Sequence, residues 1–596
     1  MTVQHRKNLL TSLLGLALAT SLLSLAAWAQ TPLDPATIPH FVEQLWTPPK
    51  TMPKVTNANF TGDYYEIAAR QKTQQILPTG FPSTTVWAFG PNASAATSDD
   101  FHTPALTIVG VTNTQVRVKW INDLKDSAGN FFTYPATVPI QQGKHWANPT
   151  GVCDGNTRPP DCQGQSKTQY TGPVPIAVHL HGSHTWSNSD GIPESWFLPA
   201  GAGTKEPFTR GSDWSQICQG TVEAGQQCTV PPAVVDGAAF FDYPNNQPPG
   251  LLFFHDHTLG ITAENIVMGL VGPYLLRGVP GVDDLPAGQV PSGPYEIPLV
   301  IQDRSFNTDG SISHLSDDGN TIVVNGKTWP YLNVEPRRYR FRVVLGTDSV
   351  FLGLRFTSGL KFTQIGNDSG FLPAPVSLST LNLAPGERAD VIVDFTPFKG
   401  KNIVLQADGD VLQFRVGTTV TGTDTTANPN TLTLLPEGPI CNPSCGTVPV
   451  RKVSLAGTLL GTINSAGQSV PKLWDSPTTE TPVCGGGGCN NAPAVEEWDI
   501  YNFGGDSHPI HLHEVRFEVI DRVSTTTGAH TPPTPGEGGH KDTVVAKGHS
   551  ILRLRVKFDL AGLYAWHCHM TSHEDDEMMR PMCIVDPLHP VPCNPN

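Results

Sequence analysis

Short stretches in which apolar and polar residues alternate are the main pattern along this chain. Residues 173–182 place Val, Ile or Leu at every second position, between Pro, Ala and His, which is the period-two signature of a half-buried strand. Apolar runs of strand length follow at residues 251–257, 299–302, 337–344, 389–395 and 563–569. The pattern predicts many short strands.

Composition supports an all-β fold in several domains. The chain has 57 Gly and 55 Pro but only 15% charged residues, a balance typical of strands joined by tight turns. Its 596 residues exceed a single core, and the usual domain size predicts about three or four domains. The polar, Gly/Pro-rich stretches 278–293 and 421–450 are the predicted linkers.

The first 29 residues have the pattern of a secretory signal peptide. A basic start at Arg6 and Lys7 precedes an apolar run over residues 9–25 and a small-x-small cleavage site at residues 27–29. A membrane anchor is the alternative, but Ser and Thr interrupt the run and a cleavage site follows. No later stretch approaches the roughly 20 apolar residues that a span needs. We expect a secreted or periplasmic protein that begins near Gln30 and has no membrane segment after cleavage.

Charge and cysteine content restrict the partners and the compartment. A net charge of −15 disfavours binding to nucleic acid or to anionic lipid. Ten of the eleven cysteines are close neighbours in sequence, which in an exported protein predicts local disulfides, although free thiols stay open. The predicted pairs are Cys153/Cys162, Cys218/Cys228, Cys441/Cys445, Cys484/Cys489 and Cys583/Cys593. Cys568 is left over.

Histidines cluster in the first and last thirds of the chain. Four His-x-His pairs stand at residues 179/181, 255/257, 511/513 and 567/569, whereas residues 290–435 contain only His314. The first and last thirds each carry a His-Leu-His motif followed by a second His-x-His motif, which suggests a duplicated unit around a spacer domain. In a strand, residues i and i+2 point to the same face, about 6.6 Å apart along the chain. One such pair is more often simply exposed, but four pairs in matched settings predict a shared metal cluster.

Strand parity predicts a second metal site beside the cluster. Cys568 lies between His567 and His569, so its side chain points to the opposite face of the strand. His508 is out of step with the histidines that follow it, and His573 and Met578 come after Cys568 at intervals of five residues. Two His, one Cys and a weak axial Met form the ligand set of a blue-copper electron-transfer site. A buried structural thiol is the alternative. Adjacent electron-transfer and multi-metal sites point to O2 reduction.

These motifs resemble those of multicopper oxidases. The patterns His-x-His-Gly, His-x-His, His-Pro-x-His-x-His and His-Cys-His-x3-His-x4-Met are all complete, and HEDDEMMRPM at residues 573–582 resembles the branch of bacterial spore-coat laccase, bilirubin oxidase and phenoxazinone synthase. The resemblance implies three cupredoxin-like Greek-key β-sandwich or barrel domains. We expect them at residues 30–280, 285–430 (the spacer, without copper ligands) and 440–596.

The resemblance also implies four copper ions and their ligands. Type 1 copper would take His508, Cys568, His573 and Met578, type 2 copper would take His179 and His511, and the type 3 pair would take His181, His255 and His569 on one ion and His257, His513 and His567 on the other. Asp190 and Glu574 match family positions that resemble proton donors to the cluster. The alternative is that each carboxylate only orients a ligand histidine.

The function implied is that of a laccase-like oxidase acting as a monomer. A small aromatic reductant (phenols, aromatic amines or bilirubin-like pigments) would supply electrons for the reduction of O2 to water. One alternative is an oxidase of Cu(I) or Mn(II). Oxidation of Cu(I) needs exposed thioether ligands, and the seven Met of this chain form no Met-rich segment, which disfavours it. A non-enzymatic cupredoxin scaffold is the other, and it would be expected to have lost ligands.

Overall fold

The structure is a computed structural model of the 596-residue chain. It describes residues 30–93, 96–151, 157–158, 161–163, 169–211, 234–315, 318–442, 444–588 and 593. The predicted signal peptide and the pair Cys218/Cys228 lie outside the described residues, and the side chains of Cys153 and Cys162 lie outside them too. No helix in the described part of the chain is long and apolar enough to cross a membrane.

Strands from the first half of the chain build two main sheets and a small third one. One sheet has the order β2-β1-β4-β10-β9, the second β3-β12-β11-β8, and the small one β5-β7-β6. The bounds are β1 (Asp63–Gln74), β2 (Thr84–Pro91), β3 (Ile108–Val111), β4 (Val116–Asn122), β5 (His145–Ala147), β6 (Thr157–Arg158), β7 (Asp161–Gln163), β8 (Val178–His181), β9 (Val234–Val235), β10 (Ala238–Tyr243), β11 (Gly250–Asp256) and β12 (Val271–Arg277), with helix α3 (Thr262–Met268) between the last two.

The middle of the chain forms an eight-stranded and a five-stranded sheet. Their orders are β16-β15-β13-β18-β23-β20-β21, with β14 beside β13, and β17-β25-β24-β19-β22. The bounds are β13 (Glu296–Phe306), β14 (Ile312–Ser313), β15 (Thr321–Val324), β16 (Lys327–Thr328), β17 (Tyr331–Val334), β18 (Arg338–Leu345), β19 (Leu352–Phe356), β20 (Phe362–Asn367), β21 (Gly370–Leu378), β22 (Leu381–Leu383), β23 (Arg388–Asp394), β24 (Asn402–Gln406) and β25 (Asp410–Val416).

The last part of the chain repeats the arrangement with an eight-stranded and a four-stranded sheet. Their orders are β28-β27-β26-β29-β35-β31-β32, with β33 beside β31, and β34-β30-β36-β37. The bounds are β26 (Val450–Ala456), β27 (Leu459–Ile463), β28 (Ser469–Lys472), β29 (Ala494–Asn502), β30 (His508–Leu512), β31 (Phe517–Ser524), β32 (His530–Thr531), β33 (His540–Lys541), β34 (Thr543–Ala546), β35 (Ser550–Phe558), β36 (Gly562–Cys568) and β37 (Met579–Ile584), with α4 (Thr571–Asp575) before β37.

Short 3-10 helices occupy several connections. They are η1 (Pro35–Thr37), η2 (Ser98–Asp100), η3 (Ser187–Ser189), η4 (Ala202–Thr204), η5 (Gly293–Tyr295), η6 (Thr396–Phe398), η7 (Pro429–Thr431) and η8 (Pro535–Glu537). The first predicted linker lies between β12 and β13, and the second lies after β25 and carries no strand among its described residues except Val450, the first residue of β26.

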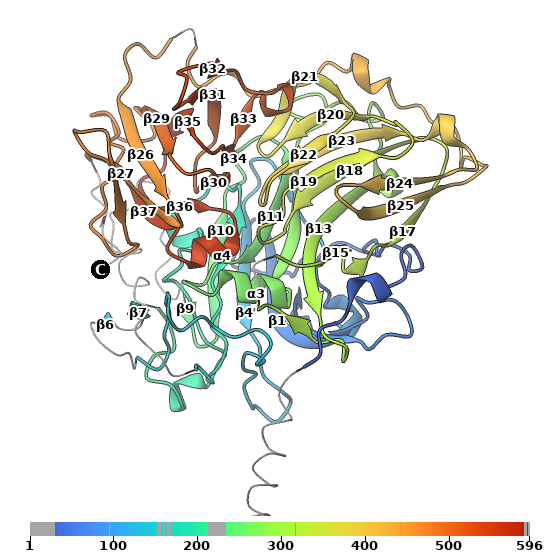
Figure 1. Ribbon diagram of the computed structural model, residues 1–596, viewed down its shortest axis with the longest axis horizontal. Helices are drawn as coiled ribbons and strands as arrows, with labels where there is room; N and C mark the ends of the chain where they lie inside the picture. Colours follow the sequence, from blue (N-terminus) through green and yellow to red (C-terminus); the bar gives the residue numbers. More distant parts are fainter. Residues whose placement is uncertain are drawn as a thin grey trace, which may run out of the picture.

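The three parts share one internal pattern. Each pairs its early strand in parallel with a later one, β1 with β4, β13 with β18, and β26 with β29, while most other neighbours are antiparallel. In Figure 1 the first part (blue to green) lies at the bottom and centre, the second (yellow) on the right and the third (orange to red) at the upper left. The all-β prediction is confirmed.

The first and third parts pack directly against each other. The main apolar core of the first part also includes Trp474, Leu563 and Met579 from the third. The middle part has its own core, whose buried members run mostly from Ile297 to Val416. The interface between the first and third parts therefore brings β8 and β11 close to β30 and β36.

The strand predicted at residues 173–182 is shorter than expected. β8 covers only Val178–His181, and an isolated bridge between Ile176 and Phe197 lies before it. Pro173 and Pro175 have no N–H to donate to a neighbouring strand, which explains the late start of the regular ladder.

Three of the five predicted disulfides are present. They join Cys441 to Cys445, Cys484 to Cys489 and Cys583 to Cys593, and Cys568 is a buried free thiol. Non-reducing peptide mapping should find the other two local pairs as well. Because short loops restrict the unfolded chain less than long ones, each bond should add only roughly 2–3 kcal/mol to the free energy of unfolding. A cross-link between Cys153 and Cys218 would contradict this prediction.

Candidate metal centre

Strand register brings the histidine pairs together across the interface. On neighbouring antiparallel strands, His255 of β11 lies opposite His179 of β8, and His511 of β30 lies opposite His567 of β36. Since alternate residues share a face, each pair of strands presents four imidazoles on one side. All eight rings are buried, and they form three groups within which the candidate ligand nitrogens lie within 4.8 Å of one another.

The first group consists of His257, His513 and His567. Their Nε2 atoms lie 3.1 to 3.4 Å from one another. Their Nδ1 atoms all lie near oxygen atoms. His513 Nδ1 donates to Asp190 Oδ2 at 2.7 Å, and His567 Nδ1 donates to the Cys568 carbonyl at 3.0 Å. Glu574 places Oε1 3.2 Å from His257 Nδ1 and Oε2 2.9 Å from His567 Nδ1. With each Nδ1 protonated, three lone pairs converge on one point. Only a cation satisfies all three.

The second group consists of His181, His255 and His569. His569 Nε2 lies 3.0 Å from His181 Nδ1, and His255 donates its Nδ1 hydrogen to the Asp256 carbonyl at 2.8 Å. His255 Nε2 is buried and has no hydrogen-bond partner in the described structure. A buried nitrogen without a partner is costly, so this group too fits a bound metal.

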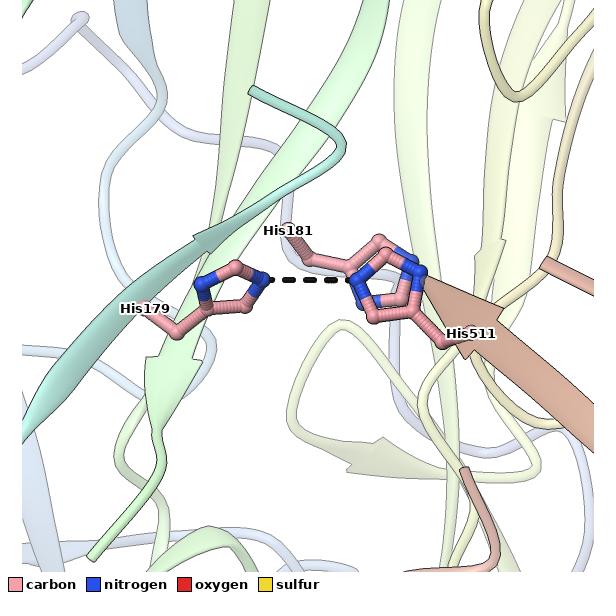
Figure 2. Close-up of side chains that lie close together, drawn as sticks. All are labelled: His179, His181 and His511. Carbon is pink, nitrogen blue, oxygen red and sulfur yellow. Dashed lines mark hydrogen bonds between the residues drawn. The ribbon is translucent and has the colours of Figure 1, made fainter. Parts of the chain in front are cut away.

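The third group adds His179 and His511 next to His181. Figure 2 shows His179 facing His511, with their Nε2 atoms 3.4 Å apart and the His181 ring stacked on that of His511. The Nδ1 atoms of both rings bond to backbone carbonyl groups. His179 Nδ1 donates to the Asp190 carbonyl at 2.6 Å, and His511 Nδ1 donates to the Asp542 carbonyl at 2.9 Å.

Burial keeps these imidazoles in the form that binds metals. Desolvation lowers the pKa well below its usual value for the rings of His181, His255, His257, His511, His513 and His569. Neighbouring imidazoles act in the same direction, because a second positive charge in the group is unfavourable. Neutral imidazole is the ligand form for copper, zinc and iron.

Cys568 faces away from the eight histidines, as strand parity predicts. Its Sγ lies 3.7 Å from His508 Nδ1, and the candidate ligand atoms of His508, Cys568 and His573 lie within 4.8 Å of one another. The Cys568 N–H donates to the Met578 carbonyl, and the Met578 N–H donates to the His573 carbonyl, so the segment containing α4 folds back over the thiol. Met578 is fully buried.

The electrostatics of the site formed by His508, Cys568 and His573 also suit a metal ion. Burial lowers the pKa of His508 to about 4 and raises the pKa of the Cys568 thiol. The buried Nδ1 of His573 has no hydrogen-bond partner among the described residues. A bound cation would stabilise the thiolate that burial alone disfavours.

The two predicted carboxylates both contact cluster histidines. Asp190 Oδ2 accepts from His513, and its Oδ1 lies 3.4 Å from His179 Nδ1. Glu574 lies between His257 and His567, 3.2 and 2.9 Å from their Nδ1 atoms, and its Oε1 accepts from Thr262 Oγ1 at 2.9 Å. Each carboxylate therefore lies close to two rings, but Asp190 Oδ1 and Glu574 Oε2 have no hydrogen-bond partner among the described residues. Proton delivery and ligand orientation both stay open as roles for the two carboxylates.

Sequence reasoning missed three groups that hold cluster histidines. Asp542 and Thr543 lie 3.2 and 2.9 Å from His181 Nε2, and the Asp256 carbonyl accepts from His255 Nδ1 at 2.8 Å while its carboxylate accepts the Ala177 and Thr258 N–H groups. Asp256 stands between two predicted ligands, a position that could have identified it. No local pattern marks Asp542 or Thr543.

Comparisons with known proteins agree with the fold and the motifs. The multicopper oxidase family profile matches residues 491–587. The laccase of Bacillus subtilis (strain 168) is 33% identical over 92% of this chain and 99% of its own length, and the laccase of Haloferax volcanii is 32% identical over 88% and 82%.

A solved structure supports the fold independently. The crystal structure of a laccase from Pediococcus acidilactici, 22% identical, superposes with a TM-score of 0.64 over 93% of this chain and 95% of that one. The cupredoxin-like all-β fold and the resemblance expected from the motifs are confirmed. The chain belongs to the multicopper oxidase family, and it is a copper oxidoreductase that uses O2.

Proposed function

We propose that this oxidase is laccase-like. It takes single electrons from phenols and aromatic amines at a type 1 site made of His508, Cys568, His573 and Met578. The eight remaining histidines hold a trinuclear cluster, His179 and His511 at type 2 copper, and His181, His255, His569 and His257, His513, His567 at the two type 3 ions. The four copper ions, when bound, supply one-electron redox chemistry and reduce O2 to water at the cluster.

The division of ligands around Cys568 carries this proposal. Its thiol belongs to the group with His508 and His573, while its chain neighbours His567 and His569 belong to two groups of the cluster. A path of a few covalent bonds therefore links the two sites. His508 is 5% exposed and His573 is half-buried, so electrons can enter at an imidazole edge near the surface while the cluster stays enclosed.

The surroundings disfavour a Cu(I) oxidase. Five of the six methionines in the described chain are buried, and Met570 is half-buried. A Cu(I) entry site needs soft, accessible thioethers, which these side chains do not offer. The disulfides fit an oxidising compartment, and we infer export to the periplasm or the medium.

Turnover on a reductant panel tests the substrate class. Electron transfer to a buried site without direct coordination tolerates many shapes, so methoxyphenols and aminophenols should consume O2 rapidly and unactivated phenols slowly. Met578→Leu should raise the type 1 potential, because a non-coordinating side chain stabilises Cu(II) less. Oxygen uptake and redox titration measure both. Negligible phenol turnover together with fast Cu(I) or Mn(II) oxidation would reject the laccase-like function.

A further inference from the structure

A loop of the middle part of the chain reaches the cluster, although that part supplies no proposed ligand. The loop joins β22 to β23 and contains Gly386, whose φ is +83°. A Cβ built on Gly386 would lie 2.7 Å from Cγ of the His569 ring. The loop backbone is therefore in direct contact with the ring, and only glycine provides the room.

Arg388, two residues further on, makes a second connection. Its side chain is fully buried, and its Nη1 and Nη2 each lie 2.5 Å from an oxygen of Asp542, which precedes β34 in the third part. Arg388 Nε also donates to the Leu251 carbonyl of β11 at 3.1 Å. One guanidinium thus joins all three parts of the chain beside the cluster.

The chain of contacts continues from Asp542 to a cluster histidine. Thr543 Oγ1 donates to Asp542 Oδ1 at 2.9 Å and accepts from His181 Nε2 at 2.9 Å, while Asp542 Oδ1 itself lies 3.2 Å from the same nitrogen. A Cβ on Gly182, the residue after His181, would clash with both the Arg388 guanidinium and the Asp542 carboxylate. The group is packed closely against the His181 strand.

His181 differs from the other seven cluster histidines in orientation. Its Nε2 hydrogen points outward to Thr543 and Asp542, so its Nδ1 faces the cluster, 3.0 Å from His569 Nε2. In the other rings Nε2 faces inward, as shown by the short contacts of His257, His511 and His567. The hydrogen bond on the outer nitrogen decides which nitrogen of an imidazole is free to bind a metal.

We propose that Arg388 is a positioning residue for the trinuclear cluster. By holding Asp542 in place it makes His181 present Nδ1, and the same loop fixes His569 through Gly386. The middle domain thereby sets two of the three ligands of one type 3 ion. This inference rests on the copper assignment of the proposed function. Without Arg388, the buried Asp542 carboxylate would lose its main partner and would not stay beside His181.

Substitution of Arg388 in the copper-loaded enzyme tests the proposal. Arg388→Met keeps the length of the side chain and removes its donors. We expect about a 10- to 100-fold loss in cluster copper affinity or turnover, the usual cost of removing an outer partner of a ligand. The blue band from the Cys568 site should be unchanged. A type 3 paramagnetic resonance signal, absent from the parent because the two ions are spin-coupled, should become visible.

Arg340→Met is the matched control. Arg340 is also buried in the middle part and forms a two-pronged pair with Asp390, at 2.8 and 2.5 Å, but neither residue contacts a cluster histidine. It should lower stability without changing the cluster signal. Arg388→Lys keeps the charge but cannot hold both Asp542 oxygens in the same way, so it should show the same signal more weakly.

Two results would overturn the proposal. One is an Arg388→Met enzyme whose cluster signal and copper content match the parent, and the other is an equal change in Arg340→Met. If Arg388→Met does not accumulate as folded protein, Arg388→Lys is the deciding variant. A cluster resonance signal in Arg388→Lys that matches the parent would then refute the proposal. Failure of the copper assignment would be recognised separately, because the parent itself would then lack the blue band or the full copper content.

Discussion

Cys568→Ser should remove the blue colour and the oxidase activity together. The colour of a type 1 site comes from charge transfer between thiolate and copper, and among the cysteines whose side chains the structure describes only Cys568 lies outside a disulfide. A serine hydroxyl does not replace a soft thiolate as a ligand. Because His567 and His569 stay in place, the cluster should keep its copper, so we expect copper content to fall from four ions to three per chain. Absorbance, copper analysis and O2 uptake measure the three effects.

Ile510→Val provides the control for a disturbed core. Ile510 lies directly opposite Cys568 in the strand register and is fully buried. Its loss of one methyl group should cost about 1 kcal/mol of stability and leave the colour unchanged. A colourless parent with full copper occupancy, or a blue Cys568→Ser enzyme, would reject the type 1 assignment.

Much of the site could be predicted from the sequence because strand parity is a local property. The alternation around Cys568 separates its side chain from His567 and His569 without any knowledge of the fold, and the structure has the same separation. The strands at residues 251–257 and 563–569 agree with β11 and β36 within one residue at each end. The strand predicted at residues 173–182 is longer than β8. Hydrophobic alternation continues through Pro173 and Pro175, but neither residue has an N–H to donate to a neighbouring strand.

The groups around the histidines could not be predicted, because they depend on contacts between distant segments. Arg388 and Asp542 are 154 residues apart, and neither stands in a pattern that points to a metal site. The nitrogen that each imidazole presents depends on where its acceptor lies after folding. For His181 that acceptor comes from another part of the chain, so the inward-facing Nδ1 emerges only from the structure.

Asp190→Asn should separate proton delivery from ligand orientation. Reduction of O2 to water consumes four protons, and a buried group beside the cluster must pass them inward. Asp190 Oδ1 is buried and has no hydrogen-bond partner in the described structure, so this oxygen is the atom that can hold a proton. The Asn side chain keeps an oxygen that accepts from His513 Nδ1, at the position where Asp190 Oδ2 now lies 2.7 Å away. Orientation is therefore preserved while the acidic proton is lost.

Two outcomes follow from these contacts. If Asp190 delivers protons, turnover should fall by about 100-fold or more, while copper content and the rate at which the reductant bleaches the blue band under anaerobic conditions stay as in the parent. If Asp190 only orients His513 and His179, turnover should stay near the parent value, because the amide oxygen still holds the ring. Loss of copper would show that the negative charge itself is needed to hold the ligands.

Glu574→Gln is the matched comparison, because Glu574 contacts His257 and His567, the other two histidines of the group that contains His513. The two oxygens of Glu574 lie 3.2 Å from His257 Nδ1 and 2.9 Å from His567 Nδ1, and Gln replaces one of these oxygens with an amide NH2 group, which donates hydrogen bonds and cannot accept them from a ring. We therefore expect Glu574→Gln to lose copper more readily than Asp190→Asn, whose second oxygen holds no ring within 3 Å. Stopped-flow bleaching, reoxidation by O2 and copper analysis of both variants give the answer. Equal copper loss in the two enzymes, with parent-like turnover per remaining copper, would show that both carboxylates hold the ligands through their negative charge and that neither delivers protons.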